Sequence, residues 1–149
     1  MNSVDILALI AGIFLIAGYI PYIYEVIKKK TIPHRASWII WSLSTIIILF
    51  GVKATGTTEA IWVPIADAIG CTVILLLSIP LGVGGWSRTD KFSFLICIAS
   101  LIIWAYTASA LIALLMNLSI YVSGYISTIK KAYAKPETES FFAWTLFLI

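Results

Sequence analysis

A single carboxylate lies deep within one apolar stretch of the chain. Asp67 comes seven residues after Ala60 in the stretch 59–81, roughly 10 Å along a helix at 1.5 Å per residue. If this stretch crosses a membrane, a lone carboxylate there costs at least about 2.5 kcal/mol, so Asp67 should face a cavity or a partner. It could accept a hydrogen bond from a substrate or carry a coupling proton. Alternatively, the carboxyl group is neutral, or bonded to a hydroxyl group on a neighbouring helix, for packing alone.

Five further side chains are candidates for a substrate pathway. Asn117 lies at a similar depth in a later apolar stretch, although an asparagine there can equally join two helices. Trp41 and Trp144 could stack on an apolar or sugar-like ring, or could anchor the chain at the membrane interface. Tyr22 and Tyr125 are candidate gate residues.

Three residues are candidates for hinges. Proline removes a backbone hydrogen bond from a helix and glycine loosens it, so both mark places where a helix can bend. The candidates are Gly18, Pro21 and Gly124.

The sequence argues against catalysis and against metal or cofactor binding. The one histidine, His34, lies in a loop, so no histidine cluster or Ser-His-Asp triad can form. Cys71 and Cys97 lie inside apolar runs, where a buried thiol is the ordinary role. There is no HExxH or GxSxG motif and no second buried carboxylate beside Asp67. We therefore expect no enzyme, no cofactor and no metal.

The composition indicates that lipid surrounds these residues. Hydrophobic residues make up 61% of the 149 and charged residues only 11%, with a mean hydropathy of +1.03. A soluble domain is nearer half apolar and a quarter charged, so too few polar groups exist here to cover a soluble surface. The net charge of +3 is weak evidence for nucleic acid, and we expect the lipid bilayer as partner instead.

The apolar runs predict an all-α integral membrane protein with about six transmembrane helices. A crossing needs about 20 helical residues. The run 92–129 holds 38 residues without a charge, too many for one crossing, and we expect a break at Thr107-Ala108-Ser109. The last run holds about ten residues, which is half a crossing, and we expect a truncated copy of a longer protein. The predicted helices cover residues 4–27, 36–52, 59–81, 92–106, 110–129 and 140–149.

The basic residues predict the orientation. The first apolar run has Asp5 and no preceding Lys or Arg, so it is read as a retained helix and not as a signal peptide. With alternating loops, one side receives nine of the ten basic residues and the other only Lys53. We therefore expect a multi-pass protein of the cell (inner) membrane. The positive-inside rule places its N-terminus outside and its basic loops in the cytoplasm. The nine are Lys28, Lys29, Lys30, Arg35, Arg88, Lys91, Lys130, Lys131 and Lys135.

Two basic loops and the helices after them match at a constant offset of 103 residues. Each copy contains Pro-x-x-x-Ser-x-x-x-Trp, in which proline closes the loop, serine lies in the first turn and tryptophan follows on the same helical face. Helices one and five then run in the same direction, which predicts a parallel repeat. The units are residues 1–82, a linker helix at 83–108 and an incomplete second repeat at 109–149, lacking the final helix of a 3-1-3-like layout. The matched pairs are Tyr22 and Tyr125, Lys28 and Lys131, Pro33 and Pro136, Ser37 and Ser140, and Trp41 and Trp144.

This layout, together with Pro21, the later Lys30-Thr31 and Ser37, resembles the SWEET, SemiSWEET and PQ-loop superfamily of small-solute transporters. In that family a Pro-Gln pair precedes a basic loop with Lys-Ser and a later serine; here Tyr22 stands in place of the glutamine. The resemblance covers most of the chain, residues 4–149, and the segment 33–38 looks more like an uncharacterised bacterial branch than like the sugar transporters.

The resemblance implies a uniporter or facilitator for a small polar solute that works by alternating access, with proton coupling through Asp67 as an option. It also allows a homo-oligomer. The alternative is a non-transporting membrane subunit or assembly factor with a PQ-loop-like fold. In that case Asp67 and Asn117 would point into helix contacts, with no continuous polar cavity between the repeats.

Overall fold

The computed structural model describes residues 3–54, 56, 61–107 and 109–147. Within these ranges the regular structure is helical, apart from one isolated bridge between His34 and Val83. The predicted start of the third stretch at residues 59–60 and the last two residues of the sixth lie outside the described ranges. The elements are α1 (Ser3–Ile27), α2 (Arg35–Ala54), α3 (Trp62–Leu81), α4 (Arg88–Thr107), α5 (Ala110–Ala134), the 3-10 helix η1 (Pro136–Thr138) and α6 (Phe141–Phe147).

Local sequence signals explain where these helices begin and end. After α1 the chain turns through Lys29, whose φ of 57° is left-handed. Pro64 is tolerated in α3 because it lies in the first turn, where a backbone N–H has no helical partner. Ser87 and Asp90 form a reciprocal capping box at the start of α4, with Ser87 N to Asp90 Oδ2 at 2.9 Å and Asp90 N to Ser87 Oγ at 3.2 Å.

The long uncharged run 92–129 is divided into two helices, as the sequence predicted. α4 ends at Thr107 and α5 begins at Ala110, while residue 108 lies outside the described ranges. Thr107 Oγ1 donates to the carbonyl of Ile103 and accepts the backbone N–H of Ser109. The Thr107 side chain therefore satisfies backbone groups on both sides of the break.

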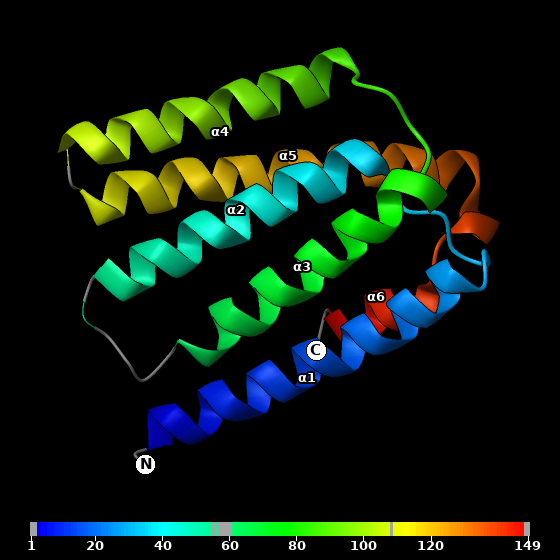
Figure 1. Ribbon diagram of the computed structural model, residues 1–149, viewed down its shortest axis with the longest axis horizontal. Helices are drawn as coiled ribbons and strands as arrows, with labels where there is room; N and C mark the ends of the chain where they lie inside the picture. Colours follow the sequence, from blue (N-terminus) through cyan, green and yellow to red (C-terminus); the bar gives the residue numbers. More distant parts are fainter. Residues whose placement is uncertain (1–2, 55, 57–60, 108, 148–149) are drawn as a thin grey trace.

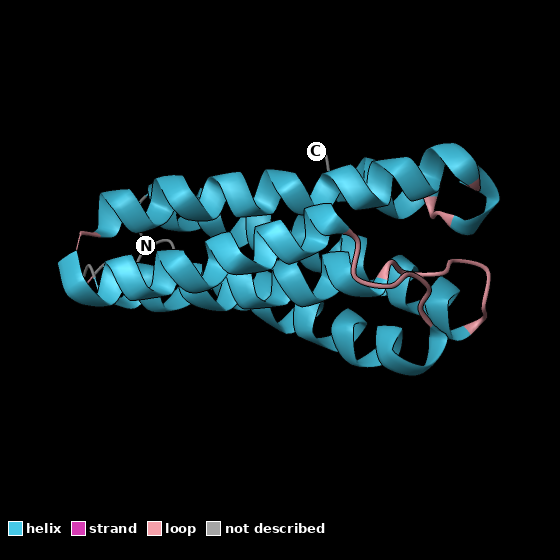
Figure 2. Ribbon diagram, turned by 90° about the horizontal axis from the view of Figure 1, so that it is seen from above, coloured by secondary structure: helices cyan, strands magenta, loops and turns pink. Residues whose placement is uncertain are grey.

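The five long helices lie side by side along one axis (Figures 1 and 2). α3 packs against both α1 and α2, α5 packs against α2 and α4, and the short α6 packs against α1. The ends of α1, α3 and α5 and the starts of α2, α4 and α6 share one end of the bundle (Figure 1). This end, formed by residues 28–34, 82–87 and 135–140, is called the basic end below.

Among the described residues, four helices are long and apolar enough to cross a membrane. This agrees with a helical membrane protein. The seven residues of α6 reach only about 10 Å, far less than the roughly 30 Å of a hydrocarbon core. The four spans are Asp5–Ile27, Arg35–Ala54, Trp62–Leu81 and Asp90–Thr107.

Apolar side chains lie on the outer faces of the bundle and polar side chains lie inside it, as expected for a protein surrounded by lipid. Large aliphatic side chains such as Leu7, Leu76 and Leu95 are 60–66% exposed on the outer faces. Hydroxyl and amide groups instead fill the interior, where Ser44 and Asn117 are at most 2% exposed. In lipid, polar groups must find partners within the protein, so they collect between helices.

Candidate functional site

Asp67 is the centre of a hydrogen-bonded cluster that joins three helices. The Tyr19 hydroxyl on α1 donates to Asp67 Oδ1 at 2.5 Å, and the Tyr121 hydroxyl on α5 donates to Oδ2 at 3.3 Å. The Cys71 thiol, one turn after Asp67 on α3, lies 3.1 Å from the Tyr19 oxygen. Asp67 is half-buried and Tyr19 is buried. The carboxylate at this depth thus has partners, as its desolvation requires.

Two small cavities meet at this cluster. The first, here called the aromatic cavity, has a volume of about 70 Å³ and is lined by Trp41, Tyr125 and Trp144 together with Asp67 and Tyr121. The second, here called the amide cavity, has a volume of about 170 Å³ and is lined by Ile48, Asn117 and Leu118, again with Asp67 and Tyr121. Asp67 and Tyr121 are therefore the side chains common to both cavities.

The two cavities lie at different depths in the bundle. Trp41 is six residues after Arg35, about 9 Å along α2, whereas Ile48 is thirteen residues after it, about 20 Å. The aromatic cavity is therefore nearer the basic end and the amide cavity is nearer the opposite end. The Tyr121–Asp67 hydrogen bond lies between them.

The aromatic candidates form one cluster. The ring of Trp41 lies 6.0 Å from that of Trp144 and 5.0 Å from that of Tyr125, between centroids. Tyr22 lies 6.0 Å from Trp144 but is 1% exposed and does not line the cavity. Trp41 is 3% exposed, and its indole N–H donates to the Tyr121 carbonyl at 3.1 Å. Trp41 therefore belongs to the interior and not to an outer interfacial belt.

Asn117 joins two helices and borders the amide cavity at the same time. Ser44 Oγ on α2 donates to Asn117 Oδ1 at 2.6 Å, and Asn117 Nδ2 donates to the Ser44 carbonyl at 3.4 Å. The amide group is 2% exposed. Its polar atoms are thus engaged in the α2–α5 contact, which is the helix-joining role considered from the sequence.

The candidate hinge glycines lie where aromatic rings of another helix approach the backbone. A Cβ on Gly124 would lie 2.4 Å from Trp41 Nε1, and one on Gly18 would lie 2.7 Å from the Phe147 ring. Pro21 lies inside α1, which continues through it to Ile27. The absence of a side chain at both glycines is therefore needed for close packing.

The repeat-motif residues surround the loops of the basic end. Ser37 Oγ donates to the Gly124 carbonyl at 3.1 Å and so links α2 to α5. Its counterpart Ser140 accepts the backbone N–H of Ala143 at 3.2 Å, which is the capping role expected for serine in the motif. Pro33 is buried, and Pro136 is exposed in the first position of η1.

Sequence reasoning missed Tyr19, Tyr121 and Cys71. Two of them carried a usable signal: Cys71 follows Asp67 by four residues, and Tyr121 lies four residues from both Asn117 and Tyr125 on one face of a helix. Tyr19 carried none, because 48 residues separate it from Asp67 and only the packing of α1 against α3 brings the two together.

Comparison of the chain with family models, with curated proteins and with solved structures gave no match.

Proposed function

We propose that this protein is a SWEET-like membrane transporter, a uniporter or facilitator for a small polar solute that works by alternating access. The observation that carries the proposal is the position of Asp67 and Tyr121, which border two cavities at different depths and separate them. A half-buried carboxylate on such a boundary is the kind of group that marks substrate or proton pathways in membrane proteins.

The helices that supply this cluster suggest how the passage opens. Tyr19 and Asp67 come from the first proposed unit, residues 1–82, and Tyr121 from the second, residues 109–149. Rocking of one unit against the other would break the Tyr121–Asp67 bond and keep the Tyr19–Asp67 bond. In this mechanism the Tyr121 hydroxyl is the gate, and the released Asp67 oxygen accepts a donor group of the solute or a coupling proton.

The contacts between helices support the proposed repeat. An offset of 103 residues relates α1 to α5 and α2 to α6. If each helix is replaced by its counterpart in the other unit, the α1–α6 contact becomes the α5–α2 contact. The structure contains both contacts. The same replacement converts the Tyr22–Trp144 ring contact into the Tyr125–Trp41 contact. An approximate two-fold relation between the units would produce both pairs, and α5, with 25 residues, is long enough for a fifth crossing.

The sizes of the cavities favour a small solute. Volumes of about 70 and 170 Å³ are below the roughly 300–1,000 Å³ of sites for drug-sized ligands. The walls combine aromatic rings with a carboxylate and an amide, which suit a compact molecule bearing hydrogen-bond donors. A larger solute would require the two units to separate.

One observation favours the rival function, a non-transporting membrane subunit. The polar atoms of Asn117 are engaged by Ser44, and the amide and aromatic cavities are separate. A subunit that uses its polar interior only for packing would also have an engaged Asn117 and separate cavities. Binding of a solute and dependence of its flux on Asp67 distinguish the two functions.

The test begins with a thermal-shift screen of the purified protein against sugars, amino acids and vitamins, followed by uptake of any stabilising compound into proteoliposomes. We expect Asp67→Asn and Asp67→Ala to lower the uptake rate at least about tenfold, because the group that is freed when the gate opens is lost. Tyr121→Phe should alter uptake as well, while the matched Tyr133→Phe, at a side chain 93% exposed, should not.

Wild-type flux from both Asp67 variants would remove Asp67 from the mechanism. Absence of any stabilising compound, with normal folding of the Asp67 variants, would favour the subunit instead. Proton coupling adds a further requirement, namely that uptake falls when a protonophore removes the pH gradient.

A further inference from the structure

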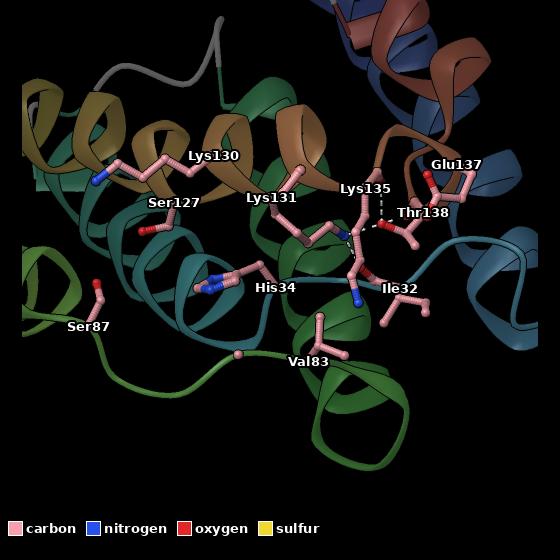
Figure 3. Close-up of a pocket in the computed structure, with 12 residues that line it drawn as sticks. Ile32, His34, Val83, Ser87, Ser127, Lys130, Lys131, Lys135, Glu137 and Thr138 are labelled. Carbon is pink, nitrogen blue, oxygen red and sulfur yellow. Dashed lines mark hydrogen bonds between the residues drawn. The ribbon is translucent and has the colours of Figure 1, made fainter.

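A second cavity system, separate from the Asp67 cluster, opens at the basic end. Its volume is about 540 Å³, and its walls come from the last turns of α5, the segment 135–138 that contains η1, the loop before α2 and the loop before α4 (Figure 3). This volume lies within the roughly 300–1,000 Å³ of small-molecule sites. Nothing in the transport proposal uses it.

The cavity is lined by three lysines and one acidic residue, Glu137. Lys131 is occupied, because its ammonium group pairs with Glu139 at 2.7 Å and also donates to the carbonyls of Ile32 and Thr138. Lys130 and Lys135 are exposed, and the ion pair recorded among the described residues involves neither of them. Two cationic groups therefore remain available to a ligand.

Neutral hydrogen-bond groups lie between these cations. Figure 3 shows His34 in the middle, with Ser87 and Ser127 on one side and Lys131 and Lys135 on the other. Burial lowers the pKa of His34, so the imidazole is neutral at pH 7 and contributes hydrogen bonding and not charge. Ser87 Oγ accepts the Asp90 N–H, and the Ser87 side chain also hydrogen-bonds to the Asp90 carboxylate.

The carboxylate of the nearby Asp90 is not itself part of the cavity wall. The Asp90 side chain is fully buried. Its oxygens accept the Ser127 hydroxyl at 2.6 Å and the Ser87 N–H at 2.9 Å. The cavity wall here thus presents serine side chains in place of a free carboxylate.

Gly84 also lines the cavity. It has a φ of +96°, and a Cβ there would lie 2.5 Å from His34 Nε2. Glycine both permits this backbone conformation and leaves room for the imidazole ring at the cavity.

We infer that this cavity binds a phosphate ester, with Lys130 and Lys135 as the anion-binding residues and His34 as a hydrogen-bond partner. Ammonium groups bind phosphate oxygens through charge-assisted hydrogen bonds. The volume exceeds the needs of an inorganic ion, and Ile32, Val83 and Ala134 supply apolar wall for the remainder of the molecule. Basic pockets between membrane helices commonly accept phosphate head groups, and a soluble phosphate ester offers the same chemistry.

Thermal unfolding of the detergent-purified full chain tests the inference with two probes, glycerol 3-phosphate and dihexanoyl-phosphatidylglycerol. Glycerol and dihexanoyl-phosphatidylcholine serve as the controls without net negative charge. We expect at least one probe to raise the Tm. In the Lys130→Gln/Lys135→Gln variant the dissociation constant of that probe should rise at least about tenfold, because two charge-assisted contacts are lost. A response to the lipid alone identifies a lipid site, and a response to glycerol 3-phosphate identifies a site open to soluble esters.

Lys28→Gln/Lys30→Gln is the matched control, because it removes two charges at the same end from residues that do not line the cavity. It should keep the probe affinity within about twofold, as should Lys130→Arg/Lys135→Arg, which retains both charges. The inference is overturned if neither probe binds, if the Lys130→Gln/Lys135→Gln variant binds normally, or if both glutamine variants lose affinity equally.

Discussion

Lys131 shows how one residue can determine the packing of a whole end of the bundle. Its ammonium group pairs with Glu139 at 2.7 Å, and the two side chains are only 9% and 7% exposed. The other Glu139 oxygen accepts the indole N–H of Trp144 at 2.9 Å. Because Lys131 also donates to the Ile32 carbonyl, this network joins α5 to the loop after α1 and to the start of α6.

We predict that Lys131→Met destabilises the protein by about 3–5 kcal/mol, because it leaves the buried Glu139 charge without a partner. The free energy of unfolding measured by denaturant titration in mild detergent checks this value. Lys130→Met is the matched control. Because the Lys130 ammonium group is exposed, this substitution should lower the free energy of unfolding by less than about 0.5 kcal/mol. Equal losses from both variants would contradict a structural role specific to Lys131.

At the scale of elements, glycine determines how closely two pairs of helices approach. A Cβ on Gly70 of α3 would lie 2.3 Å from the Tyr19 ring of α1, and one on Gly124 of α5 would lie 2.4 Å from the Trp41 indole of α2. Small residues at membrane helix contacts allow close packing where the hydrophobic effect supplies little driving force. These two contacts place Tyr19 beside Asp67 and Trp41 beside Tyr121.

We predict that alanine substitutions at two glycines of α5 and α2 change the free energy of unfolding in opposite directions. Gly124→Ala should lower the free energy of unfolding by about 1–3 kcal/mol, since the methyl group displaces the Trp41 indole. Gly51→Ala, where nothing lies within 4 Å, should raise it by up to about 1 kcal/mol through helix propensity. Unfolding of both variants in the same detergent provides the comparison. A stabilising Gly124→Ala would mean that the indole is not fixed there.

At the scale of the whole molecule, the structure places the predicted basic loops together. Residues 28–34, 82–87 and 135–140 meet at one end, and Lys53 lies at the other end of α2 (Figure 1). This grouping is what the positive-inside rule requires of a protein with cytoplasmic basic loops. The orientation itself remains a prediction from charge.

Cysteine labelling in whole cells tests that orientation. Gly85→Cys lies at the basic end, where nothing is within 4 Å, and Lys53→Cys is exposed at the other end. A membrane-impermeant maleimide should label Lys53→Cys on intact cells and Gly85→Cys only after permeabilisation. The native Cys71 and Cys97 are buried and should give little background. The reverse pattern would show that the basic loops lie outside.

Sequence patterns predicted the helical membrane class, four of the spans and the break near residue 108. They succeeded because a membrane helix is a local structure: about 20 apolar residues satisfy their own backbone groups, whatever surrounds them. The offset of 103 residues likewise needed only the sequence. The depth of Asp67 could be counted along the chain in the same way.

The partners of Asp67 depended on the tertiary structure. Tyr19, Asp67 and Tyr121 come from α1, α3 and α5, and no spacing along the chain encodes which face of one helix meets which face of another. The same is true of Trp41, which the sequence left between a stacking and an interfacial role and which packing placed in the interior. The sequence by itself thus determined which segments are long and apolar enough to cross a membrane and where the charges lie. Only packing decided that one carboxylate, two phenols and two tryptophans would converge, because such contacts depend on side-chain shape at helix interfaces rather than on local periodicity.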